Sequence, residues 1–76
     1  MTIWKTGDRV RITYGQLTVL GTVLLASTNG RSLFLSFEAL LGGYVGQMPI
    51  LMDEDGVFRD LINSQPVRLE QAAACD

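Results

Sequence analysis

Apolar and polar residues alternate in four short segments that recur along most of the chain. These segments are residues 8–14, 16–19, 32–37 and 66–70. A period of two places successive side chains on opposite faces of a β-strand, so each segment predicts a strand with one buried face. The pattern therefore predicts a mainly all-β fold.

Turn residues divide the chain into five or six antiparallel strands. Gly15 permits a tight turn, Gly21 predicts a bend or bulge within a long strand, and Asn29-Gly30 and Asp55-Gly56 favour hairpin turns. Between these signals we expect strands over residues 9–14, 16–26, 31–37, 47–52, 57–61 and 67–70. Residues 71–76 are predicted to form a flexible C-terminal tail, and residues 1–70 a single domain.

The alternation stops between residues 38 and 52. Good helix formers followed by Gly42-Gly43 predict one short helical turn near residues 37–42, closed by a glycine C-cap. Pro49 has no backbone N–H to donate, so we expect its strand to lie at an edge or to begin irregularly. Any functional surface is expected where the pattern breaks.

Three short motifs resemble those of SH3-like barrels. They are Gly7-Asp8-Arg9-Val10, Gly21-Thr22-Val23 and Val67-Arg68-Leu69-Glu70. The resemblance implies a small SH3-like barrel, and closure into a barrel would remove exposed strand edges. The central residues 35–50 depart from that pattern and are similar to uncharacterised proteins of bacteria and mobile elements, a likeness that carries no activity over.

The composition argues against an enzyme. The 76 residues include no histidine and a single cysteine, Cys75, which removes the usual general base, the commonest metal ligand and any internal disulfide. We therefore expect no catalytic residues, no cofactor and no metal. Asp60 and Glu38 are interpreted as surface carboxylates. The N-terminal residues lack the apolar stretch of a signal peptide, and no segment is long enough to span a bilayer, so we expect a cytoplasmic protein.

Hydrophobic residues make up 47% of the chain, more than a small core easily buries. We expect self-association or contact with another protein to cover the hydrophobic side chains that the core cannot bury. Aromatic residues and Met beside a glycine-rich segment have the composition of a contact surface. The predicted interface residues are Tyr44, Val45, Met48, Ile50 and Met52. The expected function is a non-catalytic interaction or assembly module, most simply a homo-oligomer.

An uneven charge distribution supports an alternative. Residues 1–37 carry four basic residues and one acidic residue, whereas residues 38–76 carry two basic and seven acidic residues. A basic N-terminal half could bind nucleic acid. The residues of that alternative are Trp4, Lys5, Arg9, Arg11 and Arg31. The sequence pI of about 4.8 disfavours it, because the molecule as a whole repels polyanions.

Two further motifs are interpreted as structural. The run Asp53-Glu54-Asp55-Gly56 lacks the ligands that an EF-hand loop needs at the positions of Leu51 and Ile62, so a hairpin turn is expected there. The glycine-rich residues 42–46 lack the Lys-Ser/Thr pair and the helix of a phosphate-binding loop. These glycines are expected to serve a cap and a bend.

Overall fold

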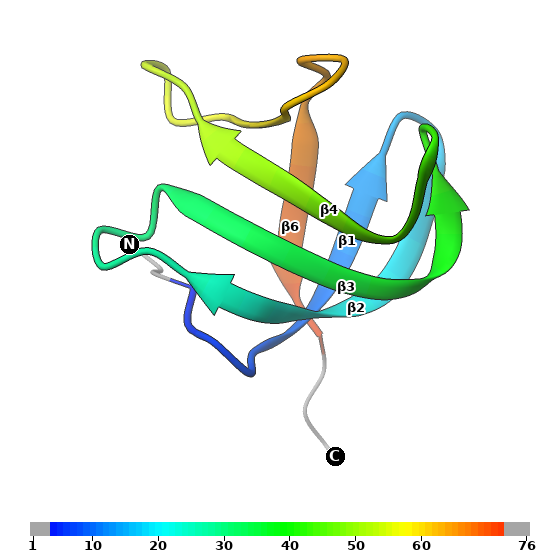
Figure 1. The fold of residues 1–76 in the computed structure, drawn as a ribbon, viewed down its shortest axis with the longest axis horizontal. Helices are drawn as coiled ribbons and strands as arrows, with labels where there is room; N and C mark the ends of the chain where they lie inside the picture. Colours follow the sequence, from blue (N-terminus) through cyan, green and yellow to red (C-terminus); the bar gives the residue numbers. More distant parts are fainter. Residues whose placement is uncertain (1–3, 73–76) are drawn as a thin grey trace.

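The structure, a computed structural model, describes residues 4–72, which form six antiparallel strands and no helix. The strands are β1 (Arg9–Tyr14), β2 (Leu17–Ala26), β3 (Ser32–Leu41), β4 (Tyr44–Met52), β5 (Phe58–Asp60) and β6 (Val67–Gln71). They form one sheet in the order β5-β4-β3-β2-β1-β6, which curls into a half-barrel (Figure 1). The prediction of an all-β fold is confirmed.

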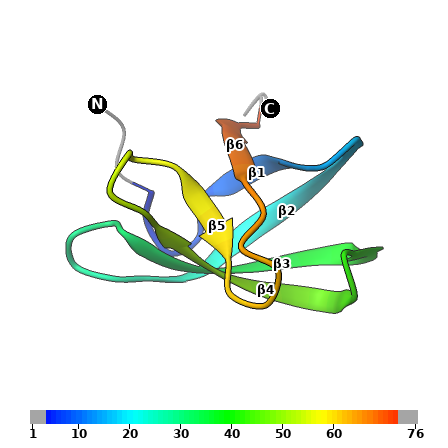
Figure 2. The same ribbon diagram turned by 90° about the horizontal axis from the view of Figure 1, so that it is seen from above.

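Successive hairpins build most of this sheet. Each of β1 to β4 pairs with the next, β5 pairs with the last three residues of β4, and β6 returns to pair with β1. An isolated bridge between Arg59 and Pro66 links β5 to the residue before β6. Seen from above, β5 and β6 approach each other over the concave side of the sheet (Figure 2). The curl therefore brings the two ends of the sheet together.

The concave side holds the hydrophobic core. In β1, buried Val10, Ile12 and Tyr14 alternate with more exposed residues, as a period of two requires. The other buried hydrophobic residues come from all the remaining strands: Val23, Leu33, Leu35, Phe37, Leu41, Tyr44, Met48, Ile50, Phe58 and Val67. One continuous core is thus assembled from alternate positions of six strands.

Gly21 lets β2 pass close to β3. A Cβ atom at this position would overlap the backbone oxygen of Ser36 and lie 2.7 Å from Cδ1 of Ile12. Any larger residue would therefore force the strands apart. The break in the β2–β3 ladder lies slightly further on, between Val23 and Leu25.

The predicted helical turn near residues 37–42 is wrong. β3 continues to Leu41, where Leu40 pairs with Val45 and Leu41 pairs with Tyr44, and Gly42-Gly43 form the turn between β3 and β4. A helical segment of five residues is too short to be stable alone, so ladder pairing and burial of Leu41 override its helix propensity. Two glycines with positive φ, +55° and +92°, make the tight turn possible.

Two sequence expectations concern strand ends. β5 covers β4 only from Ile50 to Met52, so among residues 4–72 the earlier part of β4, which includes Pro49, has a ladder partner on its β3 side alone. β6 extends to Gln71, and the N–H of Ala72 donates to the carbonyl of Arg9 at 3.1 Å. The rest of the predicted tail, residues 73–76, lies outside the described residues.

Candidate interaction surfaces

Most of the predicted interface residues lie in the core. Tyr44, Met48 and Ile50 are 7%, 0% and 1% exposed, because they occupy inward positions of β4. They are not available to a partner of the folded chain. Val45 is 80% exposed and Met52 is half-buried, so an interface there stays a prediction for these two residues. A charged residue at Met48 would test folding rather than association.

The basic residues of the nucleic-acid alternative are dispersed. Arg9 and Arg11 do point outward from β1, as their alternation with buried residues predicts. Lys5 and Arg31 are exposed in loops, and Arg31 donates from Nη2 to the carbonyl of Asp53 at 3.2 Å. Trp4 is half-buried and packs against the core.

One arginine that the sequence analysis did not single out joins the two on β1. Arg68 of β6 is exposed and lies opposite Thr13 in the β1–β6 ladder. Its neighbour Glu70 lies opposite Arg11, and their charged atoms are 3.7 Å apart. Cross-strand register, which a single sequence does not reveal, is what groups these residues.

Apolar side chains form a row across the outer face of three strands. The ladder pairs Leu25 with Phe34 and Phe34 with Pro49, and the neighbours of Phe34 and Pro49 along each strand are buried, so this row faces outward. These three residues line a hollow of about 600 Å³ together with Ala26, Ser27, Ser32 and Leu33. The bulge between Val23 and Leu25 shifts Leu25 opposite Phe34, as β-bulges commonly re-aim a side chain.

The apolar row continues toward β5. Leu51 lies two residues beyond Pro49 on the same strand, and with Leu61 it lines a second hollow of about 190 Å³. We call Leu25, Phe34, Pro49, Leu51 and Leu61 the apolar band. Leu25, Leu51 and Leu61 are 65%, 49% and 57% exposed. Phe34 and Pro49, which join them, are half-buried. Neighbouring apolar side chains of this kind mark interaction sites more often than scattered apolar residues do.

A buried carboxylate fixes the turn that carries Leu61. Asp60 is 2% exposed, so its interpretation as a surface carboxylate is wrong. Its Oδ2 accepts hydrogen bonds from the N–H of Asn63 at 2.7 Å and from the hydroxyl of Tyr44 at 2.9 Å, and its Oδ1 accepts from the N–H of Gln65 at 2.7 Å. The Tyr44 hydroxyl in turn accepts from the N–H of Ile62 at 3.0 Å. Side chains of β4 and β5 thus accept from the N–H groups of residues 62, 63 and 65, while the carbonyl of Asp60 accepts from the N–H of Ser64.

The side chain of Asn63 links the turn after β5 to β1 and to the β3–β4 turn. Its Nδ2 donates to the hydroxyl of Tyr14 at 3.0 Å and to the carbonyl of Gly42 at 3.4 Å. A Cβ at Gly42 would overlap the ring of Tyr14, so glycine is needed for this packing. The network therefore joins the β3–β4 turn, β1 and the turn after β5 at one end of the sheet.

The protonation of this network favours a structural role. Burial alone would raise the pKa of Asp60, but the hydrogen bonds from Asn63, Gln65 and Tyr44 more than offset it, so the pKa of this carboxyl lies below its ordinary value. The pKa of Tyr44 is raised, mainly by burial and further by the negative charge of Asp60. A carboxylate with a lowered pKa and three committed hydrogen bonds is a poor general base.

The acidic run at residues 53–56 forms the expected hairpin turn. Asp53 Oδ1 accepts from the N–H of Asp55 at 2.8 Å and from the N–H of Val57 at 2.9 Å, while its Oδ2 accepts from Nε of Arg59 at 2.8 Å. The Arg59 guanidinium and these N–H groups hold the pKa of Asp53 below its ordinary value. The carboxylate of Asp53 is therefore engaged within the turn itself.

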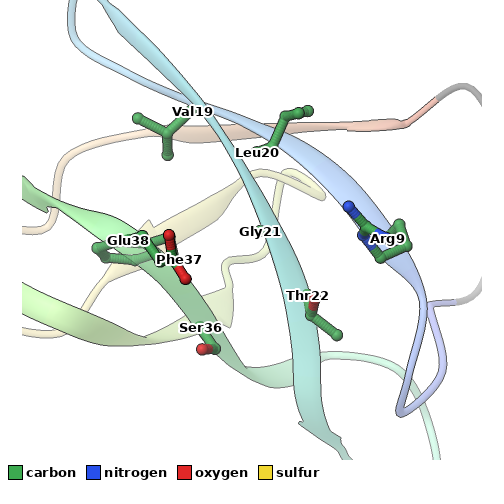
Figure 3. Close-up of a pocket in the computed structure, with 8 residues that line it drawn as sticks. All are labelled: Arg9, Val19, Leu20, Gly21, Thr22, Ser36, Phe37 and Glu38. Carbon is green, nitrogen blue, oxygen red and sulfur yellow. The ribbon is translucent and has the colours of Figure 1, made fainter.

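A third hollow, of about 420 Å³, lies beside Gly21. Its lining residues come from β1, β2 and β3: Arg9, Val19, Leu20, Gly21, Thr22, Ser36, Phe37 and Glu38. Figure 3 shows Val19 and Glu38 on the side of the gap between β2 and β3, with Arg9 on the far side of β2. Polar side chains and apolar groups share this site, in contrast to the apolar band.

Comparison with known proteins adds no relative. No family model matches the sequence, and no significant match occurs among the curated proteins or the solved structures. Residues 4–72 contain no helix long and apolar enough to cross a membrane. Within the same residues, no three or more acidic or cysteine side chains come together in a group that could hold a metal ion.

Proposed function

We propose that this chain is a small SH3-like barrel that acts as a non-catalytic protein-binding module and self-associates through the apolar band. The band is the observation that carries the proposal. Large apolar side chains lie next to one another on the outer face of β2, β3 and β4 and continue to the turn after β5. Covering them removes apolar surface from water, the main driving force for most protein association.

The geometry favours contact through the face of the sheet over strand-to-strand pairing. The part of the β4 edge that pairs with no other strand of the described residues is interrupted by Gly46, whose φ is +80°, and by Pro49, which has no N–H. Interruptions of this kind discourage the addition of another strand. Contact through the outer face needs no main-chain hydrogen bonds, so Gly46 and Pro49 do not hinder it. A second copy of the chain supplies an apolar band of the same kind, as a two-fold interface requires.

Sedimentation velocity across a wide concentration range tests the proposal. We expect the wild-type chain to self-associate and Leu25→Ser to weaken that association. Burying the remaining 65% exposed part of Leu25 contributes about 1–2 kcal/mol per copy. A two-fold interface counts the residue twice, so Kd should rise roughly 30- to 900-fold.

Leu20→Ser is the matched control, since Leu20 is 57% exposed but lies outside the apolar band. It should leave Kd unchanged. A wild-type chain that stays monomeric at millimolar concentration would remove the self-association proposal. Equal effects of the two substitutions would show that the band is not the contact.

Nucleic-acid binding is the second candidate. It rests on Arg9, Arg11 and Arg68, which share the outer face of β1 and β6. Binding of a fluorescent single-stranded oligonucleotide should then weaken steeply between low and high salt, and Arg68→Ala should reduce the salt dependence by about one phosphate contact. An absence of binding at low salt would exclude this function.

A further inference from the structure

We propose that the hollow beside Gly21 accepts an extended peptide segment of a partner protein, which pairs through its main chain with the free edges of β2 and β3. This site is distinct from the apolar band, and it requires no self-association. The ligand chemistry follows from the main-chain groups of the two parting strands and from the charge of Glu38.

The two strands part on one side of Gly21. β2 pairs with β1 along residues 17–22 but with β3 only from Gly21 onward. β3 pairs with β2 only up to Phe37, although it continues beside β4 to Leu41. Within the described residues, the β3-facing edge of residues 17–20 and the β2-facing edge of residues 38–41 therefore have no ladder partner.

Unpaired strand edges have a specific requirement. Along one edge, alternate residues point an N–H and a C=O group away from the strand already paired, and an added strand supplies partners for both in register. Peptide recognition by strand addition uses this chemistry, with affinity from main-chain hydrogen bonds and specificity from alternate side chains. Small molecules lack the repeating donors and acceptors that match such an edge.

The contact between the strands at Gly21 limits how far a bound peptide can extend, and apolar side chains line the hollow beneath it. At Gly21 the strands touch, because even a Cβ there would overlap the Ser36 backbone oxygen. Buried Phe37 and half-buried Val19 supply apolar surface at the hollow. A peptide residue that lies against these two side chains should be small and apolar.

Of the two charged residues that line the hollow, Glu38 faces the proposed peptide. Arg9 and Glu38 both line the hollow, on opposite sides of the β2 strand (Figure 3). The ion pairs found in residues 4–72 are Arg11–Glu70 and Arg59–Asp53, so neither rim charge is part of one. Because Glu38 lies on the side of the gap between β2 and β3, we expect a basic side chain of the peptide near it.

Selection from a phage-displayed library of random nine-residue peptides provides the probe. The selected peptides are synthesised and titrated into labelled wild-type protein and labelled Leu25→Ser protein while amide NMR signals are followed. We expect the largest shifts, and slower amide exchange, at residues 17–20 and 38–41 in both proteins. Methylation of alternate peptide nitrogens should weaken binding roughly tenfold or more, since each methyl removes a main-chain donor.

A charge variant completes the test. Glu38→Gln should weaken binding roughly two- to fivefold, as expected for one exposed charge contact, whereas Glu54→Gln on the distant hairpin turn should not. The proposal is overturned if selection yields no binder, if the shifts lie elsewhere, or if methylated peptides bind equally well. Because the Leu25→Ser protein is titrated in parallel, peptide binding can be measured whether or not the chain self-associates.

Discussion

Asn in place of Asp60 tests whether the buried carboxylate fastens the turn after β5. The substitution keeps the size and shape of the side chain but replaces one acceptor oxygen with an NH₂ group. In the native network, one carboxylate oxygen accepts from the N–H of Asn63 and the other from the N–H of Gln65, each at 2.7 Å. In either orientation of the amide, at least one of these main-chain N–H groups faces a donor and loses its partner.

The expected loss of stability follows from those contacts. A part-buried N–H that loses its acceptor here costs about 1–3 kcal/mol, and the remaining hydrogen bonds lose about 1 kcal/mol because their acceptor is no longer charged. The total is about 2–4 kcal/mol, a large part of the roughly 5–15 kcal/mol by which small domains are stable. The melting temperature should fall by roughly 10–30 °C.

The pH dependence gives the prediction a second readout. The pKa of Asp60 is lower in the folded chain than its ordinary value, so its contribution to stability is present above about pH 4 and is lost as pH falls through the folded pKa. The difference in unfolding free energy between wild type and Asp60→Asn should therefore be largest at pH 7 and shrink at pH 3. Asp53, whose pKa is also lowered, affects both proteins equally.

Urea unfolding, followed by the fluorescence of Trp4, the only tryptophan, measures both effects. Trp4 packs against the core and so reports its loss. Asp55→Asn is the control, because Asp55 is exposed on the hairpin turn. An Asp60→Asn protein within about 0.5 kcal/mol of wild type, the usual range for a surface substitution, would refute the structural role. So would a stability difference that stays constant between pH 7 and pH 3.

Three further predictions concern the glycines and the buried tyrosine. Gly21→Ala should lower the unfolding free energy by about 1–3 kcal/mol through overpacking between β2 and β3, and a urea midpoint equal to that of wild type would contradict the close approach. Gly42→Ala should be more destabilising than Gly43→Ala in the same assay, since both have positive φ but only the first meets a neighbouring ring. Tyr44, whose pKa is raised by burial, should ionise after the exposed phenols of the unfolded chain in an absorbance titration. The stabilising contribution of Tyr44 is present below pH 10 and is lost as pH rises through the folded pKa. Unfolding that begins below pH 10 would therefore contradict the raised pKa of Tyr44.

The alternation of apolar and polar residues was sufficient to predict the strands, but not which strands pair with one another or how far they extend. Val10 and Ile12 are buried as their alternation predicts, because a period of two is a property of each strand alone. The extension of β3 to Leu41 depends instead on pairing with β4, and five helix-forming residues gave the opposite signal. The interface prediction failed for Met48 for a related reason: the composition of a contact surface is also the composition of a core.

The two surfaces that emerged from the structure depend on registers between distant residues. Leu25 reaches the apolar band only because of a bulge opposite Phe34, and nothing in residues 23–25 alone indicates which leucine turns outward. Asp60 offered no sequence signal for burial, since its partners lie on a following turn and on β4. Such sites need the assembled sheet before they can be recognised.

The arrangement of the sheet separates two kinds of contact. A curled antiparallel sheet uses its concave side for the core, so any excess of apolar residues must appear on the convex side, where Leu25, Phe34 and Pro49 lie. In the same sheet β2 parts from β3 on the N-terminal side of Gly21, and among residues 4–72 the facing edges of residues 17–20 and 38–41 have no ladder partner. Apolar surface favours a broad partner of similar character, whereas a free strand edge favours an extended segment. The first proposal requires a partner with a broad apolar surface, and the second requires a partner with an extended segment. Each can therefore be true or false without the other.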